Sequence, residues 1–375
     1  MIYKEFKGLH LSALGLGTMR LPTLANNDSK IDIEASEEMF DYAIKNGINY
    51  FDTAYGYHGG ESEIVNGIIL KKYPRDSFYL ASKFPGFSTE NMEKKEEIFA
   101  RQLEKCQVEY FDFYLFHCLS EKSFEYYTSD EYKLMDFLLE QKKIGKIRHL
   151  GFSTHASFET TKKFIDTYRE ELEFCQIQLN YLDWTMQEAN KFAQLLQDYN
   201  IPIWVMEPVR GGMLASLSKE YTNRLTELRP DEGVPAWAFR FLQSIEGVTM
   251  VLSGMSNMDQ LKENIATFSE FKPLNEKEMD TILGIADDML KNKRLPCTAC
   301  KYCISKCPAN LNIPEIIETY NDHCLAGNDF LPKYVVAEFN KCNSPKSCIG
   351  CKSCEQVCPQ NIKISEAMAD IATKF

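Results

Sequence analysis

The chain lacks the long apolar segments of a membrane protein. Among its 375 residues no hydrophobic run approaches the roughly 18 residues of a spanning helix, and the start, MIYKEFKGLH, has neither the apolar stretch nor the cleavage site of a signal peptide. A 44% hydrophobic share beside 26% charged residues excludes intrinsic disorder. We therefore expect a cytoplasmic globular protein without a membrane partner.

The chain also lacks a basic surplus. Lys and Arg number 42 against 54 Asp and Glu, which gives a formal net charge of −12. Residues 297–375 contain eight Lys and eight acidic residues, so the negative surplus lies in residues 1–296. A protein that binds nucleic acid neutralises phosphates with a basic face. These charges therefore argue against a nucleic-acid partner, and we expect none.

Cysteine is scarce over most of the chain and concentrated at its end. Only three of the 13 Cys precede residue 297, and ten lie in the last 79 residues. Clustered cysteines in a reducing compartment bind metal more often than they form disulfides. The length exceeds what one hydrophobic core usually organises. We therefore predict two domains, residues 1–285 and residues 286–375.

Short apolar or β-branched runs alternate with amphipathic segments in the first 270 residues. The predicted strands are 13–17, 48–52, 78–83, 111–116, 147–153, 174–180, 203–206 and 249–253. The predicted helices are 35–46, 61–72, 89–107, 131–143, 157–169, 187–199, 234–242 and 258–268, followed by 275–289. Eight consecutive βα units predict an α/β fold, a (β/α)8 TIM barrel. A doubly wound sheet is the alternative, but no GxGxxG follows the first predicted strand.

The cysteine-rich end contains the pattern CxxCxxCxxxCP twice, as CTACKYCISKCP and CIGCKSCEQVCP. This is the bacterial ferredoxin pattern for two [4Fe–4S] clusters, in which the fourth Cys of each run ligates the other cluster. The predicted ligand sets are Cys297, Cys300, Cys303 and Cys358 for one cluster, and Cys348, Cys351, Cys354 and Cys307 for the other. Zinc also accepts four Cys, but two identical runs favour a ferredoxin-like iron–sulfur domain. Cys324 and Cys342 fall outside both runs and are interpreted as linker residues.

Ionisable residues close three successive predicted strands, namely Asp52, Lys83 and His117. Barrel enzymes place their chemistry at the C-terminal strand ends, and unpaired buried charges are costly, so these side chains should converge. With Tyr57 in the loop after Asp52, they suit proton donation. Lys83 would lower the pKa of Tyr57, Asp52 would hold Lys83, and His117 would polarise a carbonyl oxygen. A plain internal salt bridge is the alternative.

Two glycine-bearing segments, EPVRGGML and SGMSNMDQLKEN, suit a pyrophosphate group. The first offers backbone N–H groups at Gly211 and Gly212 beside Arg210, and the second leads into a helix N-terminus. Candidate residues in the second segment are Ser253, Gly254, Ser256 and Asn264. Plain turns are the alternative. The GESE segment at 60–63 needs no role beyond starting a helix.

Six segments occur in an order that resembles the aldo-keto reductase superfamily: FDTAYGYHGGESE, LASKF, YLFHC, GFSTH, IQLNY and VLSGMSNMDQLKENI. The cysteine-rich end resembles the iron–sulfur branch of that superfamily. The resemblance implies hydride transfer from NAD(P)H to a small aldehyde or ketone, with Tyr57, five residues after Asp52, as general acid. It implies a nicotinamide site at Ser153, Gln178 and Asn180. Ser256 stands where the family often has a basic residue for the 2′-phosphate, which leaves NAD versus NADP open.

The sequence thus predicts an NAD(P)-dependent oxidoreductase with two [4Fe–4S] clusters that exchange electrons with an external redox partner. A hydride carries two electrons and a cluster one, so direct coupling would need a flavin or a radical, and no flavin motif is visible. Two alternatives stay open. In the first, the chain is an iron–sulfur electron-transfer protein whose barrel binds another cofactor or substrate. In the second, it is a subunit whose barrel is a scaffold. A purely structural role of the clusters also stays open.

Overall fold

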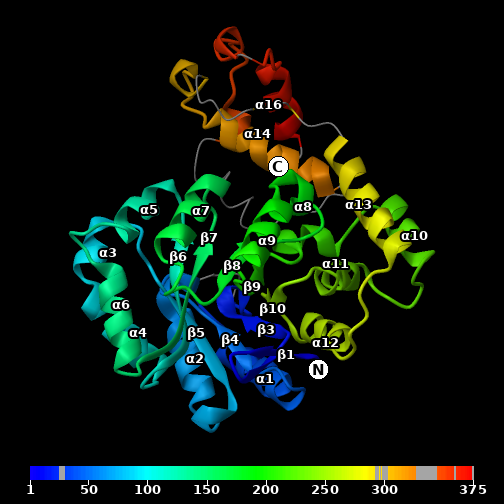
Figure 1. Ribbon diagram of the computed structural model, residues 1–375. Helices are drawn as coiled ribbons and strands as arrows, with labels where there is room; N and C mark the ends of the chain where they lie inside the picture. Colours follow the sequence, from blue (N-terminus) through cyan, green and yellow to red (C-terminus); the bar gives the residue numbers. More distant parts are fainter. Residues whose placement is uncertain are drawn as a thin grey trace. The chain divides into compact units, whose positions relative to one another are not determined.

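The computed structural model describes residues 1–24, 30–291, 295, 297, 303–326, 344–358 and 360–373. They form two compact units, Met1–Pro208 with Phe239–Leu274, and Val209–Ala238 with Asn275–Phe375 (Figure 1). The predicted domain boundary after residue 285 stays a prediction. No helix in the described part of the chain is long and apolar enough to cross a membrane.

The first unit contains a closed barrel of eight parallel strands in the order β10-β3-β4-β5-β6-β7-β8-β9 (Figure 1). The strands are β3 (Leu14–Gly17), β4 (Tyr50–Asp52), β5 (Tyr79–Phe84), β6 (Phe111–Leu119), β7 (Ile147–Thr154), β8 (Cys175–Gln178), β9 (Ile203–Met206) and β10 (Val248–Ser253). Each of them overlaps a predicted strand. The predicted TIM barrel is confirmed, and the doubly wound alternative is wrong because β10 pairs with β3 and closes the sheet.

The helices follow the strands in the expected alternation. They are α1 (Ile33–Lys45), α2 (Glu61–Leu70), α3 (Thr89–Glu93), α4 (Lys95–Cys106), α5 (Glu121–Tyr127), α6 (Leu134–Lys143), α7 (Phe158–Thr167), α8 (Asp183–Met186), α9 (Ala189–Asp198), α10 (Lys219–Thr226), α11 (Val234–Gln243), α12 (Met258–Thr267), α13 (Glu276–Lys291), α14 (Ile313–Ala326) and α16 (Ile364–Ala372). Side-chain caps begin several of them, as Asp32 does for α1 and Ser157 for α7. The single helix predicted at 89–107 is two, because the backbone leaves the helical region at Lys94 (φ −100°, ψ 23°).

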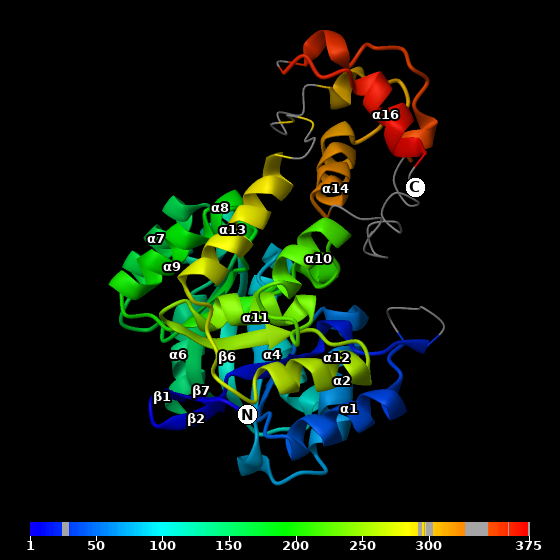
Figure 2. The same cartoon turned by 90° about the vertical axis from the view of Figure 1, so that its right-hand side faces the viewer.

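An unpredicted hairpin packs into the barrel interior. Strands β1 (Tyr3–Phe6) and β2 (Leu9–Ser12) are antiparallel, and the turn residues Lys7 and Gly8 both have positive φ, as a type I′ turn requires (Figure 2). Phe6 packs against Phe113, with ring centroids 5.6 Å apart, and against Trp204 at 5.1 Å. These rings belong to a buried cluster of Phe6, Leu11, Tyr50, Ala81, Phe113, Leu115, Phe174, Trp204, Met250 and Leu252.

The second unit has an apolar core of its own around two helices. Its buried members are Cys303, Leu311, Ile313, Ile316, Ile317, Tyr320, Cys354, Ile362, Ile364, Met368 and Ile371. The Tyr320 hydroxyl donates to Asp370 Oδ2 at 2.6 Å and ties α14 to α16. Part of this core is therefore made of the cysteine-rich segments themselves.

We expect Phe113→Ala to lower the free energy of unfolding by about 3–5 kcal/mol, because the vacated ring space lies among buried rings that cannot collapse fully. Phe271→Ala is the matched control, since that ring is 52% exposed. Urea unfolding followed by circular dichroism measures both variants. Equal stabilities for the two would contradict the closed packing of the barrel interior.

Candidate active site

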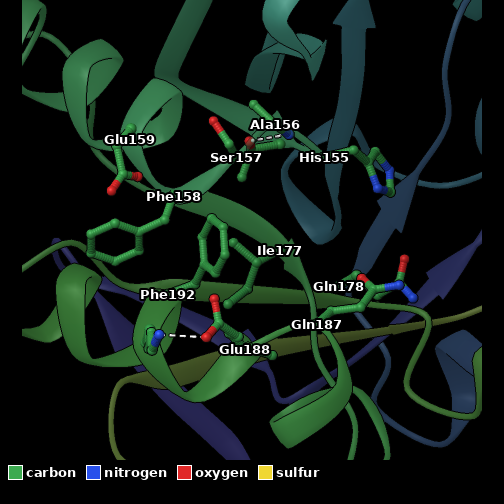
Figure 3. A pocket seen from close by; sticks show the side chains of 13 residues that line it. His155, Ala156, Ser157, Phe158, Glu159, Ile177, Gln178, Gln187, Glu188 and Phe192 are labelled. Atoms are coloured by element: carbon green, nitrogen blue, oxygen red, sulfur yellow. Dashed lines mark hydrogen bonds and ion pairs between the residues drawn. The ribbon is translucent and has the colours of Figure 1, made fainter. Parts of the chain in front are cut away.

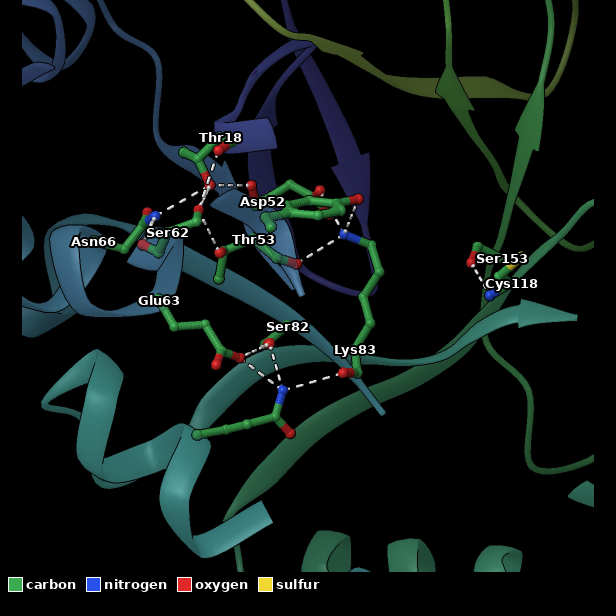
Figure 4. Close-up of polar contacts among 12 residues, drawn as sticks. Thr18, Asp52, Thr53, Ser62, Glu63, Asn66, Ser82, Lys83, Cys118 and Ser153 are labelled. Carbon is green, nitrogen blue, oxygen red and sulfur yellow. Dashed lines mark hydrogen bonds and ion pairs between the residues drawn. The ribbon is translucent and has the colours of Figure 1, made fainter. Parts of the chain in front are cut away.

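A buried ion pair lies at the C-terminal end of the barrel. Asp52 ends β4 and Lys83 lies one residue before the end of β5. Lys83 Nζ donates to Asp52 Oδ1 at 2.6 Å and to the Thr53 carbonyl at 2.8 Å (Figure 4). Lys83 is fully buried and Asp52 is 3% exposed. A charge at this depth is tolerated only when it is paired and hydrogen-bonded.

Tyr57 and His117 lie beside this pair. The Tyr57 hydroxyl accepts a hydrogen bond from Lys83 Nζ at 3.2 Å. The rings of Tyr57 and His117 are 6.0 Å apart between centroids and nearly perpendicular, at 81°. Within the described part of the chain, His117 Nδ1 is buried without a hydrogen-bond partner. The structure therefore brings together the four residues that the strand ends and the loop after Asp52 predicted.

Burial is the largest single influence on the pKa of each of these four groups, and their charged neighbours modify it. It raises the pKa of Tyr57 above 10.0, and Lys83 opposes this shift. It also raises the pKa of Asp52, again opposed by Lys83. For Lys83, burial lowers the pKa, but Asp52 and Tyr57 outweigh it, so the pKa is raised. Burial, Lys83 and His155 lower the pKa of His117 to about 3. The expectation that Lys83 would lower the pKa of Tyr57 is therefore wrong in its net result, because burial is the larger effect.

Two buried hydrogen-bond networks hold the backbone of the ion pair (Figure 4). Behind Asp52, the Thr18 hydroxyl donates to the Asp52 carbonyl at 2.8 Å and lies 2.8 Å from the Ser62 hydroxyl. Behind Lys83, Gln102 Nε2 donates to the Lys83 carbonyl at 3.1 Å and to Glu63 Oε1 at 2.7 Å. Ser62 and Glu63 start α2 as expected, but both are fully buried and support the site. Their sequence gives little signal, since polar residues at a helix start are usually solvated.

The predicted nicotinamide residues cluster at the ends of β7 and β8. The Ser153 hydroxyl accepts from the Cys118 backbone N–H at 2.8 Å. Gln178 and Asn180 each donate to Asp183 Oδ2 at 2.7 Å, so Asp183 orients both amides. Sequence reasoning missed Gln176, which pairs with Ser153 across the sheet and is 3% exposed. Its Oε1 is buried with no hydrogen-bond partner among the described residues.

The predicted phosphate-binding residues divide between the two units. In the first unit, Ser253 ends β10 and its hydroxyl accepts from Asn264 Nδ2 at 3.1 Å, while the Ser256 N–H donates to Gln260 Oε1 at 2.8 Å. A Cβ on Gly254 would meet the Arg20 side chain at 3.3 Å. In the second unit, Arg210, Gly211 and Gly212 begin η5 (Arg210–Ala215), and all three have positive φ.

A cavity of about 640 Å³ reaches the ends of β7 and β8 (Figure 3). The rings of Phe158 and Phe192, 5.7 Å apart, lie on one side of it, with His155 and Gln178 toward the other. Burial lowers the pKa of His155, which favours the neutral imidazole. The cavity therefore combines an aromatic wall with polar groups near the predicted nicotinamide residues.

Four predicted cluster ligands line one pocket of the second unit. Cys307 from the first run lies there with Cys348, Cys351 and Cys354 from the second, together with apolar residues that include Leu311. The Leu311 N–H donates to Cys307 Sγ at 3.4 Å. Four thiols from two runs around one apolar pocket fit a [4Fe–4S] cluster with an exchanged fourth ligand. In the described segments, no three His, Cys, Asp or Glu side chains lie close enough together to hold one single metal ion.

The other predicted ligand set is described in part. Cys303 is buried in the core of the second unit, and Cys297 and Cys358 pack against that core. Cys300 and the linker residue Cys342 lie outside the described residues, and so does the side chain of Cys324.

Comparisons with known proteins agree with these two parts. Residues 13–287 match the aldo/keto reductase family, and residues 296–363 match a 4Fe–4S dicluster domain. The chain is 23% identical over 305 residues to the NADH-specific methylglyoxal reductase of Escherichia coli, which covers 69% of the chain and 90% of that protein. It is 25% identical over 290 residues to the 9,11-endoperoxide prostaglandin H2 reductase of Trypanosoma cruzi, covering 76% and 90%.

The fold also matches solved structures. An aldo-keto reductase of Bacillus halodurans in its holo form superposes with a TM-score of 0.62 at 24% identity, over 76% of this chain and 96% of that one. A thermostable aldo-keto reductase in complex with the inhibitor epalrestat superposes with a TM-score of 0.62 at 22% identity, over 76% of this chain and 99% of that one. The chain belongs to the aldo/keto reductase family of oxidoreductases and carries a C-terminal 4Fe–4S dicluster domain.

Proposed function

We propose that the barrel reduces a small aldehyde or ketone with NAD(P)H, and that the second domain carries two [4Fe–4S] clusters for electron transfer. The observation that carries the first part is the bridge that Lys83 Nζ makes between Asp52 Oδ1 and the Tyr57 hydroxyl. The methylglyoxal reductase among the relatives supports a small carbonyl substrate. An intact proton-donating set favours an enzyme over a scaffold.

When bound, the nicotinamide supplies a hydride to the carbonyl carbon. Tyr57 passes its hydroxyl proton to the carbonyl oxygen, which completes the alcohol, and the Lys83 ammonium stabilises the tyrosinate that is left. Neutral His117 donates a hydrogen bond to the same oxygen. The unpaired Gln176 Oε1 and the Ser153 hydroxyl fit the carboxamide of a nicotinamide, which offers both a donor and an acceptor.

We expect Tyr57→Phe to reduce kcat/KM for carbonyl reduction by about 10²–10⁴-fold, because the general acid is lost. Tyr55→Phe is the matched control, since Tyr55 packs beside Lys105, with Nζ 5.0 Å from its ring centroid. The assay follows NADH and NADPH oxidation with a panel of small carbonyls, and nucleotide fluorescence measures binding. Full activity in Tyr57→Phe, or no activity of the wild type with any carbonyl, would overturn the proposal.

We expect the pH profile of kcat/KM to show no break from His117 between about pH 5 and about pH 8. The pKa of about 3 keeps its imidazole neutral throughout this range, and the raised pKa of Tyr57 keeps the hydroxyl protonated. The profile is compared with that of His155→Asn, which removes the neighbouring imidazole. A break near 6.5 that persists in His155→Asn would contradict the assignment of a neutral His117.

For the clusters, we expect about eight irons per chain after anaerobic purification, with visible absorption that dithionite bleaches. Cys307→Ala should retain about four, because Cys307 supplies the fourth ligand to the cluster held by the second run. Cys118→Ala in the barrel is the control and should retain the wild-type iron content. Iron analysis and visible spectra decide between the outcomes. Zinc without colour, or wild-type iron content in Cys307→Ala, would contradict the ligand assignment.

A further inference from the structure

The loop that carries three predicted ligands presents an apolar tip to solvent. Ile349 follows Cys348 and is 71% exposed, the largest fraction among the exposed large hydrophobic side chains of the described residues. Cys351 is exposed as well, whereas Cys354 is buried. Gly350 and Lys352 both have positive φ, which turns the loop tightly between these cysteines. Ile349, Cys351 and Lys352 of this loop also line the pocket that contains Cys307, Cys348 and Cys354.

Exposed lysines accompany this tip. Lys346, Lys352 and Lys363 are all exposed, and Lys352 also lines the pocket that contains Cys348 and Cys354. Glu355 is the only acidic residue between 344 and 358, and its carboxylate accepts the Ser365 N–H at 2.8 Å. It is thus held against the start of α16.

We propose that Lys346, Ile349, Lys352 and Lys363, here called the Ile349 surface, form the docking site for a small acidic one-electron carrier protein. Glu366 on α16 is also exposed and Glu355 is partly exposed, so the three lysines outnumber the two carboxylates beside them by one. Residues 297–375 as a whole contain eight Lys and eight acidic residues, so the positive surplus is confined to this surface. Positive charge beside the cysteine pocket complements a carrier protein with an acidic face. It would repel a carrier with a basic face.

The shape and chemistry of the surface fit a brief redox encounter. Interfaces combine an apolar centre with a polar rim, and redox encounters are small and weak, steered by charge rather than by area. In the transfer, the reduced carrier loses one electron and the oxidised cluster gains it, with no bond made or broken and no proton moved. The inference rests on the proposed function, in which Cys307, Cys348, Cys351 and Cys354 hold one of the two clusters.

The experiment uses the anaerobic holoprotein and, as probe, an acidic flavodoxin in its hydroquinone form. Stopped-flow spectra follow the semiquinone that forms as each flavodoxin gives up one electron. We expect the second-order rate constant to fall with added salt and to fall about tenfold or more in Lys346→Glu/Lys363→Glu. Carbodiimide cross-linking followed by mass spectrometry should join flavodoxin carboxylates to lysines of the Ile349 surface.

Further measurements separate a loss of docking from a general charge effect and from a loss of the clusters. Lys71→Glu/Lys277→Glu makes the same charge change at exposed lysines elsewhere and should keep the wild-type rate. Reduced methyl viologen, a small cation, should reduce all variants alike, which shows that their clusters are intact. Ile349→Ser should weaken the reaction without changing its salt dependence. Iron content and dithionite bleaching are measured first, so absent clusters would refute the proposed function rather than the docking site.

Equal flavodoxin rates in the two charge variants would overturn the docking site. So would cross-links from Lys346 or Lys352 to carboxylates of the same chain in place of the flavodoxin, because the protein itself would then occupy the surface. The charge reversal at Lys346 and Lys363 avoids residues adjacent to a predicted ligand, and Lys352→Gln provides a milder second variant.

Discussion

The buried ion pair between Lys83 Nζ and Asp52 Oδ1 is stable only because neighbouring residues of the barrel hold both partners in place. An ammonium removed from water needs a fixed counter-charge and a full set of acceptors, and a displaced partner would leave a buried charge uncompensated. Asp52, the Thr53 carbonyl and the Tyr57 hydroxyl fill that set. The residues behind them, such as Thr18 and Gln102, bind backbone carbonyls of the pair and so fix the strands on which the charges sit.

The packed interior explains why the charges meet at one level. Side chains alternate between the inside and outside of each strand, so the inward position after Tyr50 is Asp52, and the one after Ala81 is Lys83. Tyr50 and Ala81 belong to the aromatic cluster that the N-terminal hairpin helps to fill. Buried above this apolar cluster, Tyr57 and His117 are removed from water, which favours the protonated hydroxyl and the neutral imidazole.

Periodicity predicted the barrel because each strand is a short apolar run bounded by polar residues. The strand ends predicted that Asp52, Lys83 and His117 lie together because buried charges need partners. The hairpin was missed because its strands are short and half exposed. Glu63 and Gln102 were missed because their burial depends on how α2 and α4 pack, which residue type alone does not reveal. Gln176 was missed because it lies on the same strand as Gln178, two residues earlier, and the sequence does not separate the two. The structure does, because the amide oxygen of Gln176 is buried without a hydrogen-bond partner among the described residues. The net rise in the Tyr57 pKa likewise depends on burial.

The two proposed activities differ in the number of electrons that they move, two for a hydride and one for a cluster, and this limits how the two parts of the chain can work together. The proposed carbonyl chemistry consumes an electron pair and a proton at one buried point, where Tyr57 and Lys83 are held by many hydrogen bonds. The cysteine pocket is instead lined by a loop on which the predicted ligand Cys351 is exposed. A rigid, desolvated site suits bond formation, whereas single electrons need only close approach at a surface. The buried barrel site therefore suits the proposed two-electron chemistry, and the exposed cysteine loop suits the proposed one-electron transfer. Any coupling between them must include a step that splits an electron pair.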